Sequence, residues 1–114
     1  MSKKFFAAIL FVLVLGIFAM SAFADDNDAY VREEAARRNM TLITLERAKS
    51  IASEKLQSNN LIFKDIDLDN EAKDYPNNTD FRPVYQFECI KDGQEYDVDI
   101  DAVTGEVLKF KLDN

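Results

Sequence analysis

The spacing of hydrophobic residues divides the chain into three parts. Residues 5–20 form a continuous apolar run, and residues 45–56 repeat apolar side chains every three or four positions. Several stretches after residue 61 alternate apolar with polar side chains. Three- and four-residue spacing indicates an amphipathic helix, and strict alternation indicates a half-buried strand. The pattern therefore predicts an apolar leader, one helix and then a set of strands.

The apolar leader has the parts of a secretory signal peptide. Two lysines precede Phe5–Met20, which carries no charged or strongly polar side chain, and the segment closes with Ala22-Phe23-Ala24. Small residues at these positions are what signal peptidase requires. We expect cleavage after Ala24, with Met1–Ala24 as the signal peptide and a periplasmic or secreted mature protein. The alternative is an uncleaved anchor, because the run up to Ala24 just reaches the ~20 apolar residues of a spanning helix.

The clearest helix prediction is Thr44–Gln57. Thr44 is a favourable N-cap, and Glu46 suits the positive end of the helix dipole. One apolar stripe runs along this segment, formed by Leu45, Ala48, Ile51, Ala52 and Leu56. The polar segment before it, residues 25–41, has a thin apolar face, and we interpret it as a loosely held extension or a weak helix.

Alternation predicts four strands after the helix: Leu61–Asp69, Val84–Lys91, Glu95–Asp101 and Glu106–Leu112. The side chains expected to face inward are Ile62, Ile66, Leu68, Tyr85, Phe87, Cys89, Tyr96, Val98, Ile100, Leu108, Phe110 and Leu112. Asp92-Gly93 signals a tight hairpin turn, and the polar residues 71–80 form a loop. We predict an α+β fold, with one amphipathic helix packed on a three- to four-stranded antiparallel sheet.

The outward face of this sheet is charged. Asp97, Asp99 and Asp101 point away from the helix, and Lys109 and Lys111 can lie opposite Asp97 and Asp99 across neighbouring strands. Asp101 is expected to accept backbone N–H groups in the following turn, which Thr104 and Gly105 complete. We interpret this turn as structural.

Net charge limits the partners of the mature chain. Loss of the two leader lysines leaves 12 of the 14 basic residues against all 21 acidic ones, a net charge near −9. Nucleic acids and anionic membranes attract positive patches, so neither is expected as a partner. The 90 residues that remain are enough for one domain.

The residue types that most catalytic sites require are missing. The chain has no His, one Cys and three Gly, which leaves no parts for a zinc site, a Cys–His nucleophile or a glycine-rich phosphate loop. We therefore predict that the protein is not an enzyme and has no cofactor. The single Cys89 is interpreted as a buried small hydrophobic residue, with an intermolecular disulfide or a reactive thiol as the alternative.

Two motifs resemble the PepSY domain, which is named after the propeptides of secreted metallopeptidases. One is the helix start Leu45-Glu46-Arg47-Ala48 with Ile51-Ala52, and the other is Tyr96-x-Val98-x-Ile100-Asp101-Ala102-x-Thr104-Gly105-Glu106-Val107-Leu108. The second motif specifies alternation, turn and register together. The likeness covers Leu42–Leu112, so we place a PepSY-like domain at 42–114. Two features depart from the family pattern: the 25–41 extension lies outside it, and the 71–80 loop is long.

The resemblance implies a non-catalytic exported binding module. In metallopeptidase propeptides such domains are thought to assist folding and to restrain the protease, and here we expect any such action in trans. The partner would be an exported protease or another envelope protein. The residues expected to contact it are Asp97 and Asp99 on the outward sheet face and Tyr75 and Arg82 in the loop.

An alternative function is the binding of Ca²⁺ or a small ligand in the cell envelope. Asp65-x-Asp67-x-Asp69 opens like a calcium loop, but Asn70 replaces the turn glycine and Pro76 stands where the bidentate Glu belongs. Period-two spacing instead places the acidic residues on an outward, solvated strand face. We therefore predict no metal-binding residues.

Overall fold

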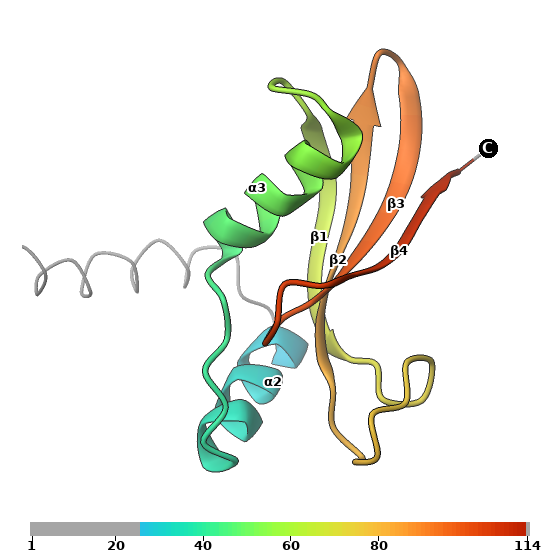
Figure 1. Cartoon of the computed structure of the whole chain (residues 1–114). Helices are drawn as coiled ribbons and strands as arrows, with labels where there is room; N and C mark the ends of the chain where they lie inside the picture. Colours follow the sequence, from blue (N-terminus) through green and yellow to red (C-terminus); the bar gives the residue numbers. More distant parts are fainter. Residues whose placement is uncertain (1–25, 114) are drawn as a thin grey trace, which may run out of the picture.

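Two helices cover one face of a four-stranded sheet in the computed structural model, which describes residues 26–113 (Figure 1). The elements are α2 (Asp26–Arg37), α3 (Leu45–Leu56), β1 (Ile62–Asn70), β2 (Pro83–Lys91), β3 (Gln94–Asp101) and β4 (Val107–Leu112). The strands are antiparallel and lie in sequence order, β1-β2-β3-β4. The predicted α+β fold is confirmed, with four strands in the sheet.

The expected signal peptide lies outside the described residues. Of the helices that are described, none has the length and apolar character to cross a membrane.

Helix α3 begins and packs as its sequence predicts. The Thr44 side chain caps it by accepting a hydrogen bond from the backbone N–H of Arg47 (3.0 Å). Ala48 and Ala52 are fully buried, and these small side chains let the helix lie close to the sheet. Gly105 has a positive φ of 83°, and a Cβ there would lie 3.1 Å from Ile51 Cδ1. Only glycine therefore meets both the turn conformation and the close approach of α3.

The core lies between the helices and the inward face of the sheet. Its largest buried side chains on β2 are Tyr85 and Phe87, and the Phe87 ring meets that of Phe63 edge to face at 5.1 Å. Cys89 is fully buried, and burial raises the pKa of its thiol to about 11. A thiol in that environment stays protonated, which confirms the interpretation of Cys89 as a small hydrophobic core residue.

A β-bulge in β1 overturns one part of the strand prediction. Simple alternation placed Ile62 on the inward face with Ile66 and Leu68, but the register shifts between Phe63 and Asp65. One extra residue there reverses the alternation, so that Phe63 packs in the core and Ile62 is 60% exposed.

Strand β4 also differs from expectation. Phe110 lies on the helix side of the sheet and stacks on Tyr96, with ring centroids 5.9 Å apart, as the alternation predicts. Phe110 and Leu112 are nevertheless 42% and 40% exposed. The Lys55 ammonium of α3 lies 5.3 Å from the centroid of the Phe110 ring.

The N-terminal segment, interpreted from its sequence as a loosely held extension or a weak helix, forms helix α2. It is a regular 12-residue helix. The side chains Val31 and Ala35 of its thin apolar face are buried against the sheet. Arg32 donates a hydrogen bond to the Tyr85 hydroxyl (3.4 Å), which in turn donates to the carbonyl of Ile43 (2.8 Å). The segment is thus a packed helix rather than a loosely held extension.

Adjacent alanines of α2 provide a matched test of this packing. Ala35→Glu should lower the free energy of unfolding by about 3 kcal/mol, because it buries an unpaired carboxylate. Ala36→Glu changes an exposed neighbour in the same helix and should stay within about 0.5 kcal/mol. Urea unfolding of both variants measures the difference. Equal stability of the two variants would show that α2 does not pack on the sheet.

Candidate functional site

The loop of residues 71–82, between β1 and β2, folds back over the outward face of the sheet. Tyr75 reaches β3, where its hydroxyl donates a hydrogen bond to Asp99 Oδ2 (2.7 Å). Asp99 is consequently only 5% exposed. Burial and the Asp99 carboxylate both raise the pKa of Tyr75, so the hydroxyl remains a donor. The loop is therefore attached to the sheet at its centre.

An ion pair attaches the end of the loop. Arg82 Nε donates to Asp101 Oδ2 (2.8 Å), and Arg82 Nη1 donates to the carbonyl of Tyr75 (3.1 Å). The other carboxylate oxygen, Asp101 Oδ1, accepts the backbone N–H groups of Val103 (2.8 Å) and Thr104 (2.9 Å). Burial alone would raise the pKa of Asp101, but the N–H of Thr104, the Arg82 guanidinium and the N–H of Val103 hold it below its ordinary value. Asp101 thus remains charged and joins the loop to the β3–β4 turn.

Asn70 closes the base of the loop. Its side-chain oxygen accepts the backbone N–H groups of Ala72 (3.1 Å) and Arg82 (2.9 Å), and its side-chain nitrogen donates to the carbonyl of Asp80 (3.1 Å). One amide therefore binds both ends of the loop. Sequence reasoning missed this role, although an Asn directly before a polar turn is a known signal for such local hydrogen bonds.

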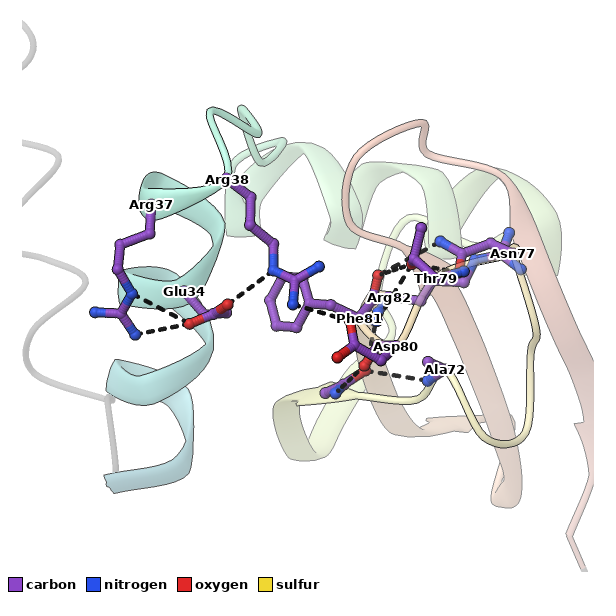
Figure 2. Close-up of polar contacts among 10 residues, drawn as sticks. Glu34, Arg37, Arg38, Ala72, Asn77, Thr79, Asp80, Phe81 and Arg82 are labelled. Carbon is purple, nitrogen blue, oxygen red and sulfur yellow. Dashed lines mark hydrogen bonds and ion pairs between the residues drawn. The ribbon is translucent and has the colours of Figure 1, made fainter.

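Helix α2 holds the far side of the loop (Figure 2). Arg38, just after the helix, pairs with Asp80 (2.9 Å), and its guanidinium lies 4.8 Å from the centroid of the buried Phe81 ring. Glu34 accepts from Arg38 (2.8 Å) and from Arg37 (2.7 Å), as Figure 2 shows, and these hydrogen bonds lower the pKa of Glu34. The two departures from the family pattern, the N-terminal segment and the long loop, therefore contact each other.

Acidic side chains gather at the start of the loop. Burial raises the pKa of Glu71 to about 7, supported by the hydrogen bond that the protonated Glu71 carboxyl donates to Asp74 and by the nearby charges of Asp69, Asp74 and Asp99. Within residues 26–113, no three His, Cys, Asp or Glu side chains are grouped so that they could hold a metal ion.

Three of the four residues predicted to bind a partner come together in this cluster: Tyr75, Arg82 and Asp99. The fourth, Asp97, lies opposite Lys111 on the same sheet face, and Asp99 lies opposite Lys109. The prediction that these two lysines face these two aspartates is confirmed, and the structure supplies the register. The prediction of a solvated acidic face is wrong for Asp99 and Asp101, which are each 5% exposed because the loop covers them. The hydrogen bonds of Asp99, Tyr75 and Arg82 therefore hold the loop in its conformation.

Comparison with family models matches residues 42–111 to PepSY, described as the peptidase propeptide and YPEB domain. The chain belongs to the PepSY family. Membership makes residues 42–111 a module of the propeptide type, and α2 lies before it as an addition to the PepSY domain. Searches of curated proteins and of solved structures gave no significant match.

Removal of the Arg82 guanidinium tests how the loop is attached. Arg82→Met should lower the free energy of unfolding at pH 7 by about 2 kcal/mol, because Asp101 loses its buried partner. The pKa of Asp101 is lowered from 3.8, so this contribution is present above about pH 4 and is lost as the carboxylate protonates in more acid solution. Denaturant unfolding at pH 7 and pH 2.5, with the exposed Arg47→Met as control, measures both effects. An unchanged stability at pH 7 would contradict the role of the pair.

Glu71 gives a pH dependence of opposite sign. Its pKa is raised from 4.5 to about 7, so the folded chain holds a proton that the unfolded chain has released, and stability falls as pH rises through this interval. Glu71→Gln should therefore stabilise the protein by about 1 kcal/mol at pH 8, with allowance for solvent screening, and have little effect at pH 4. Thermal unfolding between pH 4 and pH 8 measures the change. The exposed Glu54→Gln serves as control, and a parallel profile for the two variants would refute the prediction.

Proposed function

We propose that this PepSY protein is an exported, non-catalytic module that binds a secreted or envelope protease in trans and restrains it. The observation that carries the proposal is the family match, since PepSY is a peptidase propeptide domain. The charge of the mature chain is in keeping with a protein partner, because net acidity disfavours nucleic acid and anionic membranes. The signal-peptide pattern of Met1–Ala24 supports export.

The 71–82 loop is the surface we assign to the partner. Its internal hydrogen bonds and its three attachments favour a single conformation before binding. These attachments are Tyr75 to Asp99, Arg82 to Asp101 and Arg38 to Asp80. A pre-organised loop loses less conformational entropy on binding than a flexible one. The exposed residues of the loop, Lys73, Asp74, Pro76, Asn78, Thr79 and Asp80, are the ones available for contact.

Inhibition in trans can be measured directly. The protein purified after export should slow a metallopeptidase secreted by the same organism, in a concentration-dependent and saturable manner. A double variant of the exposed loop surface, Lys73→Ala with Asp74→Ala, should weaken inhibition by about tenfold, the equivalent of 1.4 kcal/mol. Glu46→Ala with Arg47→Ala, on the exposed side of α3, is the matched control and should inhibit like the wild type.

Two results would contradict the proposal. If no secreted protease is slowed and none is retained by the immobilised protein, the chain is not a protease-binding module. If both double variants inhibit like the wild type, inhibition does not use the loop.

A further inference from the structure

The two edge strands of the sheet differ in how accessible their outward backbone N–H and C=O groups are to a strand from another chain. The strand order leaves β1 and β4 at the edges, and each edge strand carries backbone groups that can pair with another chain. Natural proteins block such edges with bulges, charges or side chains that occupy the backbone.

Strand β1 is closed. It contains the bulge between Phe63 and Asp65, and its own carboxylates occupy backbone donors. Asp65 Oδ1 accepts the N–H of Ile66 (3.1 Å), and Asp69 Oδ1 accepts the N–H of Asn70 (2.8 Å). A second strand could not form a regular ladder along this edge.

Strand β4 is open. The backbone N–H of Asp113 donates to the carbonyl of Glu95 (2.8 Å), and Lys111 lies opposite Asp97. Because hydrogen-bonded and non-bonded pairs alternate in antiparallel sheets, the N–H and C=O groups of Phe110 and Leu112 point away from β3. Among the described residues, no side chain hydrogen-bonds to these groups.

The side chains of β4 define what a fifth strand would meet. Phe110 (42% exposed) and Leu112 (40% exposed) form an apolar row on the helix side, next to Tyr96. Lys109 and Lys111 lie on the opposite side of the strand, where their neighbours on β3 are acidic. The sheet thus changes from acidic to basic at its last strand, and an acidic strand would continue the alternation of charge.

We propose that β4 accepts an extended segment of a partner protein in which apolar and acidic residues alternate. Its apolar side chains would cover Phe110 and Leu112, and its carboxylates would lie beside Lys109 and Lys111. A second copy of β4 fits poorly, because an antiparallel pairing that keeps the apolar rows together places lysine opposite lysine. The inference rests on the proposed function in one respect, that the chain binds a protein, but it names a separate surface and the chemistry of its partner.

A peptide pair tests the chemistry on the unaltered protein. The probe is the capped, fluorescent heptapeptide EYDVDID, which has the required alternation and is the sequence of Glu95–Asp101. Its control, KYKVKIK, keeps the apolar residues and replaces each acidic residue with lysine. Fluorescence anisotropy at about 0.15 M salt, where the Debye length is near 8 Å and local charges dominate, should show at least about tenfold tighter binding of the acidic peptide.

A proline substitution tests the edge itself. Leu112→Pro removes an outward N–H without removing a hydrogen bond to β3, so the melting temperature should stay within a few degrees of the wild-type value. The affinity for the acidic peptide should fall at least about tenfold. Leu112→Ala keeps the N–H and should retain part of the affinity. Should the proline variant fail to fold, the peptide pair still decides the proposal.

Equal affinity for the two peptides, no binding of either, or unchanged binding by folded Leu112→Pro would overturn the proposal. A dimer of the peptide-free protein that Leu112→Pro dissociates would assign the edge to a second copy instead. Failure of this proposal can be told apart from failure of the proposed function. If the protein slows a protease but does not bind the peptide, only the proposal for the β4 edge is wrong. If it binds the peptide but slows no protease, only the proposed inhibition is wrong.

Discussion

The carboxylate of Asp101 is the group on which the attachment of the 71–82 loop depends. One of its oxygens binds the β3–β4 turn through Val103 and Thr104, and the other binds the β1–β2 loop through Arg82. The group is buried and its pKa is lowered, so it stays ionised at neutral pH. A charge held in this way is costly to leave unpaired, which makes the position of Arg82, and with it the end of the loop, a requirement of the fold.

Further contacts hold the loop beside that attachment. Asn70 binds both ends of the loop, and Tyr75 reaches Asp99. On the other side Arg38 brings the end of α2 to Asp80. The helix that precedes the PepSY domain therefore contacts a loop within it, and both lie at the same end of the sheet (Figure 1).

Much of the fold could be predicted because its signals are local. Three signals depend on residues close in sequence or on a fixed period: the cap at Thr44, the helix stripe with Ala48 and Ala52, and the alternation that places lysines of β4 opposite aspartates of β3. The exposed Ile62 could not be predicted from alternation, because a bulge depends on how β1 pairs with β2.

The sequence predicted which residues belong to the candidate site, but it did not predict how they are arranged. Tyr75, Arg82 and Asp99 were selected as surface residues, but the fold brings them together and buries Asp99. Period-two spacing tells which face of a strand a side chain occupies. It does not tell whether a loop 24 residues away in sequence covers that face, as Tyr75 covers Asp99. The exposure of Phe110 likewise depends on where α3 ends relative to β4, which is a tertiary property.

The most direct test of the Asp101 link is amide hydrogen exchange in the wild type and in Asp101→Asn. Asparagine keeps an oxygen for the N–H groups of Val103 and Thr104 but presents an uncharged amide to Arg82. The account predicts that the hydrogen-bonded amides of Ala72, Tyr75 and Arg82 are protected in the wild type. In the variant these amides should exchange faster while those of the turn stay protected. Unchanged protection of the loop in Asp101→Asn, or an unprotected loop in the wild type, would contradict the account.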